Sequence, residues 1–183
     1  ASLTDHHYVE GTTKELAAST IKSVHWGDNY TTESSDKIDV NYELVGTPDN
    51  ASGTIASNSV VVTYYYRLKS AKLTVHHYIE GTTKELATTE SYDKKWTDEY
   101  STNPSDKIDI NYELVETPSN ANGIISGDTI VIYYYKLKSA KLMVNHYIEG
   151  TTTKLAATES YDKKWTDEYT TSPSDKVSTN YEL

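Results

Sequence analysis

The feature that most constrains this chain is a unit of about 70 residues that occurs nearly three times. Residues 71–114 and 140–183 align without a gap, and 34 of their 44 positions are identical. The block SYDKKWTDEY occurs at residues 91–100 and again, unchanged, at residues 160–169. Repetition usually gives a chain length or several copies of a binding surface, whereas an enzyme needs only one site. The repeats therefore favour a binding or structural protein over a catalyst.

The repeat predicts two complete domains and part of a third. We place them at residues 1–70, 71–139 and 140–183, called repeats 1, 2 and 3 below. A unit of this size is just long enough to bury its own core. Repeat 3 stops before it reaches an equivalent of residues 129–137. A unit that begins near Asn41 would also give two complete copies, so the register of the domains stays open.

Composition excludes several classes of partner and site. The net charge of −10 argues against nucleic acid or anionic lipid as a partner. The chain has no cysteine, so disulfides and cysteine-bound zinc are excluded. This favours a Gram-positive bacterial surface over an animal extracellular protein. No stretch is apolar enough to insert into a membrane, and we expect any signal peptide and anchor to lie outside this sequence.

Alternating hydrophobic residues predict a β-rich fold, α+β at most. In repeat 2, residues 73–79 and 129–137 alternate most clearly, and residues 85–91 and 108–115 complete a set of four or five strands. The core faces are predicted to carry three sets of side chains: Leu73, Val75, His77 and Ile79; Ile108, Ile110, Tyr112 and Leu114; and Val131, Tyr133, Tyr135 and Leu137. Residues 92–100 break the alternation and predict either one helical turn or an irregular crossover packed through Trp96.

The connection between repeats contains neither glycine nor proline. Residues 66–73 (YRLKSAKL) lead from the last strand of one repeat almost directly into the first strand of the next. Short connections without glycine restrict swivelling. We therefore expect the small domains to form an elongated, semi-rigid, monomeric rod.

Several motifs resemble the MucBP (mucin-binding protein) repeat of Gram-positive surface proteins. Both complete repeats contain a YELV segment, a Thr-Pro-x-Asn-Ala-x-Gly segment and a strand that ends in consecutive tyrosines. The matching residues are Tyr42–Val45, Thr47, Pro48, Asn50, Ala51, Gly53 and Val60–Tyr66 in repeat 1, and Tyr112–Val115, Thr117, Pro118, Asn120, Ala121, Gly123 and Ile130–Tyr135 in repeat 2.

The resemblance implies tandem β-grasp, ubiquitin-like domains on a secreted, wall-anchored adhesin of the cell surface. It also implies a host mucin glycan or glycoprotein as the partner. The chain departs from the family pattern at its first turn, at the histidines of its first strand (His7, His77 and His146) and in the DKKWTDEY block.

Tandem histidines at residues 6–7 and 76–77 suggest a metal site, but neighbouring residues of a strand point to opposite faces and cannot bind one ion together. Repeat 3 has Asn145 in place of one of them. We therefore predict no metal site. One histidine of each pair is expected to pack on the inner face with a ring nitrogen satisfied.

Two further clusters of polar residues have ordinary explanations. Asp106, Asp109 and Asn111 could offer oxygens to calcium, but their spacing does not match an EF-hand loop, so a solvated acidic loop is favoured. Lysine and asparagine recur at matched positions, as in Lys107 and Asn111, which allows an isopeptide bond. These two residues are too close in sequence to brace a domain.

Aromatic residues are the candidates for ligand binding. Trp26, Trp96 and Trp165 recur in every repeat and could stack on sugar rings with avidity, although a lone tryptophan is more often part of the core. Tyr65 and Tyr134 should point away from the core because of the alternation around them. The alternative is that these exposed rings only stabilise cross-strand pairs.

No catalytic motif is found: the chain lacks a G-x-S-x-G segment, a glycine-rich phosphate loop and a pair of catalytic carboxylates. We expect no enzymatic activity and no cofactor. Two functions remain, namely binding to mucin glycans or glycoproteins, and a structural stalk that projects a distal binding domain from the cell wall.

Overall fold

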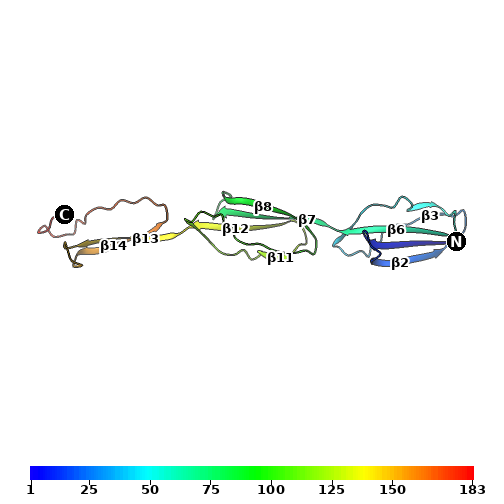
Figure 1. The fold of residues 1–183 in the computed structure, drawn as a ribbon, viewed down its shortest axis with the longest axis horizontal. Coiled ribbons are helices and arrows are strands. Elements are labelled where there is room, and N and C mark those ends of the chain that lie inside the picture. The colour runs from blue at the N-terminus through cyan, green and yellow to red at the C-terminus, as the bar shows by residue number, and fades with distance from the viewer. The chain divides into compact units, whose positions relative to one another are not determined.

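The computed structural model describes residues 1–183 and consists of strands without a helix (Figure 1). The strands are β1 (Ser2–Val9), β2 (Glu15–Ser23), β3 (Asn29–Thr31), β4 (Tyr42–Leu44), β5 (Ser52–Thr54), β6 (Ser59–Leu68), β7 (Ser70–Ile79), β8 (Glu85–Lys95), β9 (Glu99–Ser101), β10 (Tyr112–Leu114), β11 (Asn122–Ile124), β12 (Thr129–Leu137), β13 (Ser139–Tyr147) and β14 (Lys154–Lys164). Accordingly, the protein contains no helix suited to crossing a bilayer. The predicted β-rich class is confirmed.

The chain divides into two compact units. One contains Ala1–Thr74, Ser91–Ser101 and Asn122–Ile130, and the other contains Val75–Glu90, Thr102–Ala121 and Val131–Leu183. Strands β7, β8 and β12 contribute residues to both units.

Repeat 1 forms a four-stranded sheet in the order β2-β1-β6-β4. The central strands β1 and β6 are parallel, with His7 opposite Tyr64 and Tyr8 opposite Tyr65. The edge strands β2 and β4 are antiparallel to their neighbours. This order is that of a β-grasp sheet, in which the first and last strands lie side by side at the centre. A short antiparallel ribbon of β3 and β5 occupies the connection between β2 and β6.

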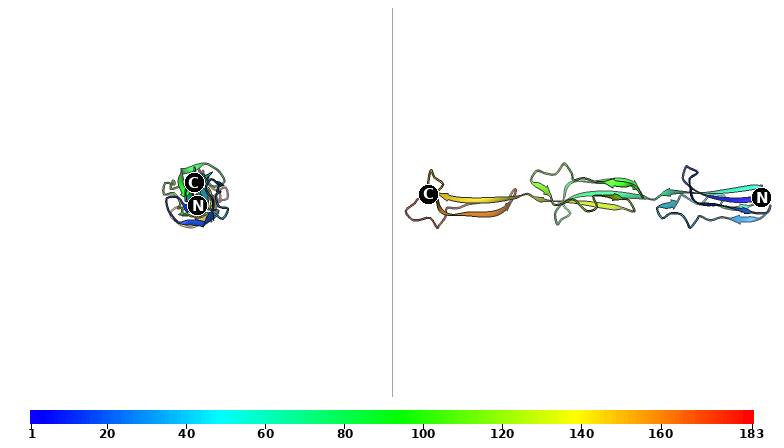
Figure 2. Two further views of the ribbon diagram at one scale, coloured as in Figure 1. Left: turned by 90° about the vertical axis from the view of Figure 1, so that its right-hand side faces the viewer. Right: turned by 90° about the horizontal axis from the view of Figure 1, so that it is seen from below.

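Repeat 2 follows the same plan, with the sheet order β10-β12-β7-β8 and a ribbon of β9 and β11. Repeat 3 forms only the antiparallel hairpin of β13 and β14. These two strands lie side by side in Figure 1 and in the right-hand view of Figure 2.

The core confirms the predicted alternation in the longest strands. Leu73, Val75 and His77 of β7 are buried, and so are Val131, Tyr133 and Tyr135 of β12. Ile79 and Leu137, at the ends of these strands, are half-buried. The alternation works because successive side chains of a strand point to opposite faces, so one face of each sheet can be apolar.

The strand predicted at residues 108–115 is shorter than expected and covers only Tyr112–Leu114. Ile110, predicted to face the core, is 75% exposed. The cause is a turn: the Asp109 side chain accepts a 2.8 Å hydrogen bond from the Asn111 amide, and the Asp109 carbonyl accepts one from the Tyr112 amide. Aspartate favours such turns because its side chain can replace a backbone acceptor.

The second strand of repeat 2 is longer than expected, since β8 continues through Tyr92 to Lys95. The predicted helical turn or crossover at residues 92–100 is instead a strand end, a tight turn and the start of β9. Charged residues are tolerated in β8 because it is an edge strand of the sheet.

A single residue joins consecutive repeats, as the glycine-free connection predicts. β6 ends at Leu68 and β7 begins at Ser70, so Lys69 alone connects them. The Lys69 amide donates to the Asn41 carbonyl at 2.9 Å, and its carbonyl accepts from the Trp96 amide at 2.9 Å. Lys138 makes the equivalent bonds with Asn111 and Trp165 at 2.9 and 2.8 Å. Both linker residues are therefore held on two sides by backbone hydrogen bonds.

Candidate binding site

The predicted contact residues Tyr65 and Tyr134 lie on the outer faces of their sheets. Tyr65 is 41% exposed and Tyr134 is 38% exposed, whereas Tyr64, Tyr66, Tyr133 and Tyr135 beside them are buried. The register of β1 and β6 pairs Tyr65 with Tyr8. Two tyrosines thus lie next to each other on a face that the core does not use.

A histidine extends the aromatic surface beside Tyr8. The His6 and Tyr8 rings stack with centroids 4.9 Å apart and an angle of 15° between their planes. His6 Nδ1 lies 2.6 Å from the Ser19 hydroxyl, which donates a 2.5 Å hydrogen bond to Glu15. These bonds fix the imidazole across the sheet, so the stacked pair presents one orientation.

An ion pair borders the tyrosines on β4 and β6. Arg67 Nε donates a 2.8 Å hydrogen bond to Glu43 Oε1. This bond, and the charge of the same carboxylate, raise the pKa of Arg67. The guanidinium therefore stays charged, with both side chains about half exposed to solvent.

Repeat 2 reproduces this surface with small changes. His76 stacks on Tyr78 at 4.9 Å, and its Nδ1 lies 2.8 Å from the Thr89 hydroxyl. Lys136 pairs more loosely with Glu113, at 3.9 Å. We call each set a tyrosine face: His6, Tyr8, Tyr65, Glu43 and Arg67 in repeat 1, and His76, Tyr78, Tyr134, Glu113 and Lys136 in repeat 2. In repeat 3, Asn145 replaces the histidine and accepts a 2.7 Å hydrogen bond from the Thr158 hydroxyl.

A tyrosine face combines exposed rings with charged donors and acceptors on a rigid sheet. Aromatic rings offer a flat apolar surface, and their hydroxyl groups offer hydrogen bonds at low cost in conformational entropy. Such a surface suits a flat, polar ligand with apolar patches of its own, such as a sugar ring.

The tryptophans lie outside the core, so the alternative expectation that they are core residues is wrong. Trp26 is 62% exposed, Trp165 is 39% exposed, and Trp96 is half-buried. Lys69 Nζ lies 4.6 Å from the centre of the Trp96 ring, and Lys138 Nζ lies 4.7 Å from that of Trp165. Two of the three indoles thus lie against the linker lysines.

The second histidine of each pair belongs to the core, as expected. His7 is 3% exposed and stacks on Tyr64 at 5.4 Å, with Nδ1 3.1 Å from the Tyr66 hydroxyl. His77 is fully buried and makes the same contacts with Tyr133 and Tyr135. No group of three or more histidine, aspartate or glutamate side chains is placed to hold a metal ion.

The motif Thr-Pro-x-Asn-Ala-x-Gly has a structural role. Ala51 is buried, and Asn50 Nδ2 donates a 2.9 Å hydrogen bond to the Val61 carbonyl. A Cβ atom added to Gly53 would lie 3.1 Å from the Tyr30 hydroxyl, so only glycine fits beneath this ring without displacing it. Gly123 packs against Tyr100 in the same way. The motif therefore reports the fold and not a ligand.

The polar positions considered for calcium or an isopeptide bond also serve the backbone. Asp109 forms the turn described above, and Asn111 donates to it and accepts from the linker Lys138. The Lys107 amide donates to the Ser105 hydroxyl at 3.1 Å. In these bonds Asp109 takes part through its side chain, whereas Lys107 and Asn111 take part through their backbone.

The motifs and the fold agree with a comparison to known families. The model of the MucBP domain matches residues 6–67 and 72–136, which is more than half of the chain. The chain belongs to the MucBP family. In both MucBP matches the tyrosine face lies within the matched residues.

Two curated relatives also match. Internalin J of Listeria monocytogenes serotype 4b (strain F2365) is 33% identical over 168 residues, which cover 89% of this chain and 18% of the relative. Internalin J of serovar 1/2a (strain ATCC BAA-679 / EGD-e) is 30% identical over 173 residues, covering 91% and 20%. The MucBP chain thus spans about a fifth of the length of these relatives.

Among solved structures, two tandem-repeat proteins show distant likeness. Streptococcal High Identity Repeats in Tandem (SHIRT) domains 3–4 from a cell surface protein align at 14% identity with a TM-score of 0.38, covering 75% of this chain and 98% of theirs. The type 2 repeat of the mucus binding protein MUB from Lactobacillus reuteri aligns at 11% identity with a TM-score of 0.31, covering 75% and 99%. At these scores the likeness supports no argument about function.

The sequence singled out Tyr65 and Tyr134 but not their neighbours on the tyrosine face. Tyr8 and His6 alternate with the buried His7 along β1, and this alternation alone predicts that both lie on the outer face. The position of Tyr8 opposite Tyr65 depends on the register between strands more than 50 residues apart, which no local pattern contains.

Proposed function

We propose that this chain is the non-catalytic repeat region of a bacterial surface adhesin, and that its tyrosine faces bind host mucin or other glycans and glycoproteins. The observation that carries the proposal is the matched outer face in two repeats. Tyr65 and Tyr134 stay exposed on surfaces whose other side chains are ordered by stacking and hydrogen bonds. Membership of the mucin-binding domain family supports the choice of ligand class.

Repetition raises the overall affinity of a chain whose individual binding sites are weak. A single exposed face of a few aromatic rings gives low affinity, because it buries little area and excludes little water. Two such faces on one chain convert the second contact into an intramolecular event, which raises the overall affinity without a new contact. A mucin, with many similar glycans on one backbone, is the kind of ligand that rewards this arrangement.

We also propose Trp26, Trp96 and Trp165 as ligand contacts, but expect them to contribute less than the tyrosine faces. Trp26 is the most exposed of the three and is the one we expect to contribute if a second surface takes part. Trp96 and Trp165 have one ring face near a lysine, which leaves less of the ring for a ligand.

The test is a glycan and mucin binding screen with the 183-residue chain. We expect saturable binding to at least one mucin or O-glycan fraction, and a loss of at least about tenfold in the Tyr65→Ala/Tyr134→Ala variant. The matched control is Tyr92→Ala/Tyr181→Ala, which removes two tyrosines of similar exposure, both 46%, from outside the tyrosine faces. Binding that is equal in both variants would contradict the site, and no binding at all would contradict the adhesive function.

The alternative is a purely structural stalk that carries a distal binding domain away from the cell wall. The specific observation in its favour is the linker, where one lysine is held by two backbone hydrogen bonds and lies over a tryptophan ring. A chain that binds nothing in the screen would support this function. In both cases we place the protein outside the cell, attached to the wall.

A further inference from the structure

A force that pulls on the two ends of the chain crosses repeat 1 through β1 and β6. β1 begins at Ser2, and β6 ends at Leu68, next to the linker residue Lys69 that leads into β7. The force therefore enters the repeat at the start of β1 and leaves it at the end of β6. The chain has no cysteine, so no disulfide shares this load. The pairing between β1 and β6 then decides how much force the repeat resists.

β1 and β6 lie side by side and run in the same direction (Figure 1). Their register is unbroken over eight pairs, whereas the register between β1 and β2 shifts on both sides of His7. Backbone hydrogen bonds extend the pairing at both ends: the Ser2 amide donates to the Asn58 carbonyl at 2.9 Å, and the Glu10 amide donates to the Tyr66 carbonyl at 2.8 Å. We call this continuous pairing the β1–β6 seam.

The parallel direction of the two strands determines how the seam is loaded. Pulling the start of β1 away from the end of β6 drives one strand along the other. The hydrogen bonds of a parallel pair are evenly spaced along it, so this sliding strains all of them together. Pulling both strands at the same end would instead open the bonds one after another. Since a single hydrogen bond is weak, a seam that must break as a whole resists a larger force.

Buried side chains oppose the same sliding motion. Leu3 of β1 and Val62 of β6 are buried on the inner face of the sheet. The His7 ring stacks on Tyr64 with centroids 5.4 Å apart, and its Nδ1 atom lies 3.1 Å from the Tyr66 hydroxyl. A shift of one residue between paired strands would turn these side chains toward the opposite face. The core therefore locks the register of the seam.

β6 is also held on its other side, by the antiparallel strand β4. The Lys69 amide donates to the Asn41 carbonyl at 2.9 Å, and the Val45 amide donates to the Tyr65 carbonyl at 2.9 Å. The strand that receives the load from the linker is thus bonded to a neighbour on each side.

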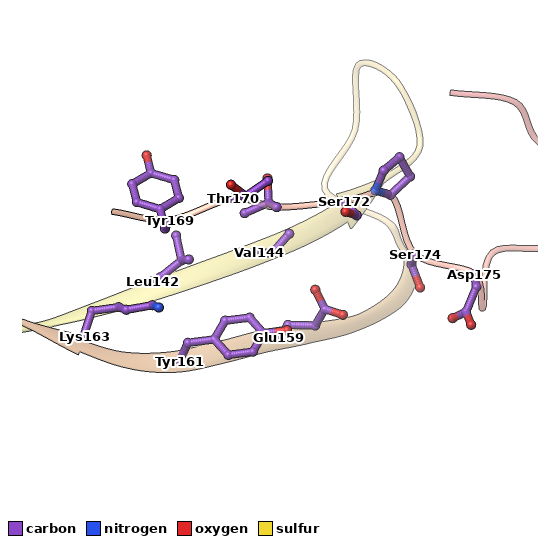
Figure 3. Close-up of a pocket in the computed structure, with 12 residues that line it drawn as sticks. Leu142, Val144, Glu159, Tyr161, Lys163, Tyr169, Thr170, Ser172, Ser174 and Asp175 are labelled. Carbon is purple, nitrogen blue, oxygen red and sulfur yellow. The ribbon is translucent and has the colours of Figure 1, made fainter. Parts of the chain in front are cut away.

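The hairpin of β13 and β14 has the opposite geometry. Ser139, where β13 begins, lies opposite Lys164, where β14 ends. Figure 3 shows part of this antiparallel pair, with Leu142 and Val144 on β13 and Tyr161 on β14. A force between the two ends of such a hairpin separates its strands bond by bond. Load bearing therefore requires the parallel seam and is assigned here to repeat 1.

We propose that repeat 1 is a load-bearing module, in which the β1–β6 seam keeps the domain folded when the two ends of the chain are pulled apart. The source of the force rests on the proposed function, because a surface adhesin is pulled between its cell and its ligand. The resistance itself needs no ligand. Residues 10–58 lie outside the path of the force and are extended only after the seam breaks.

The test is single-molecule force spectroscopy of the 183-residue chain in two pulling geometries, without any glycan. Because the chain has no cysteine, introduced cysteines give unique attachment points. Ala1→Cys with Ser70→Cys loads the seam along its length, and Ala1→Cys with Asn58→Cys loads it at one end. All three positions are exposed, so both variants should resist denaturant equally.

We expect the rupture force at one loading rate to be at least about twofold higher with handles at positions 1 and 70 than with handles at positions 1 and 58. Rupture between positions 1 and 70 should lengthen the chain by about 200 Å, given about 3.5 Å for each extended residue less the length of the folded strands. Failure of this test would leave glycan binding untouched, since the two measurements share no ligand.

Two matched leucine variants, pulled through positions 1 and 70, test whether the seam is the part that breaks first. Leu3 lies on β1 in the core, and Leu16 lies on β2 and packs against the same core. Leu3→Ala should raise the rupture rate at constant force at least about tenfold, because its contacts are lost as β1 slides. Leu16→Ala should stay within about threefold, because β2 is outside the path of the force. Each effect is scaled by the loss of stability in chemical denaturation.

Two results would overturn the proposal. One is an equal rupture force in the two pulling geometries, since the parallel direction of the strands would then add no resistance. The other is an equal scaled effect of Leu3→Ala and Leu16→Ala, since the domain would then yield as a whole and not at the seam.

Discussion

His77 on β7 and Glu90 on the neighbouring strand β8 are hydrogen-bond partners, with His77 Nε2 3.2 Å from Glu90 Oε1. In repeat 1 the carboxylate comes instead from the histidine's own strand, where Asp5 lies 4.0 Å from His7. The position of Glu90 is Thr20 in repeat 1, and the position of Asp5 is Val75 in repeat 2. Each repeat thus keeps one carboxylate beside its buried histidine, but on a different strand.

This exchange predicts non-additive effects when one repeat is converted to the other. Val75→Asp alone should destabilise repeat 2 by about 3 kcal/mol, because it buries a second carboxylate near Glu90. Adding Glu90→Thr should restore about 1 kcal/mol or more, since Thr20 donates to Asp5 through both its amide and its hydroxyl in repeat 1. A double-mutant cycle by chemical denaturation measures the coupling. Additive losses would show that the two positions are independent.

Repeat 1 should lose stability in mild acid through His7. Burial lowers the pKa of His7 below its ordinary 6.5, opposed by the charge of Asp5 and reinforced by His6. The unfolded chain therefore binds a proton at a higher pH than the folded chain. The stability from a neutral His7 is present above pH 6.5, falls below it, and levels off beneath the lowered pKa.

Amide exchange of Val62 and Tyr64 at about pH 7.5 and about pH 5.5, corrected for intrinsic rates, measures this loss in repeat 1. His7→Phe keeps a ring against Tyr64 but removes the proton, so it should flatten the dependence. An unchanged pH dependence in this variant would assign the effect to other groups.

Thr97 should be replaceable by glycine with a gain in stability. Its φ is +73°, a region that a β-branched residue rarely adopts, and Thr166 has +72° at the equivalent position. Repeat 1 has Gly27 there, with φ +84° and the same amide bond to an isoleucine carbonyl. Thr97→Gly should stabilise repeat 2 by about 1 kcal/mol. The reverse change, Gly27→Thr, is the matched experiment in repeat 1, and a thermal scan that shows no opposite shifts would contradict the assignment.

The linker tryptophans should contribute to stability more than Trp26 does. Trp96→Ala removes the ring beneath Lys69 and should cost about 1 kcal/mol, measured as faster exchange of the residue 96 amide. Trp26→Ala should change stability by less than about 0.5 kcal/mol, because this side chain is mostly exposed. Equal effects of the two changes would mean that the lysine contact adds nothing.

Much of the sheet could be predicted from the sequence, because alternation is a local property. Short stretches of sequence are enough to predict which side chains of β7 and β12 face the core, and that the linker between repeats is short. Ile110 could not be placed correctly, since the Asp109 turn competes with the alternation around it. The extension of β8 to Lys95 could not be predicted either, because the charged residues 93–95 lie on an edge strand and need no apolar partner.

The candidate site was predictable only in part. The outward direction of Tyr65 and Tyr134 follows from the alternation along their strands. That Tyr8 and His6 lie on the strand next to Tyr65 follows only from the parallel register of β1 and β6. The tryptophans were harder to place, since a positive φ turn after Trp96 directs the chain and the ring to the linker. Long-range register and turn geometry therefore carry the information that local patterns lack.

The most direct test of the proposed function is an NMR titration of the chain with a mucin O-glycan fraction. We predict shifts in the ring signals of Tyr8, Tyr65, Tyr78 and Tyr134, which saturate together, while the signals of Tyr92 and the buried Tyr64 and Tyr133 stay in place. Saturable shifts that avoid both tyrosine faces, or an absence of shifts at any glycan concentration, would contradict the account.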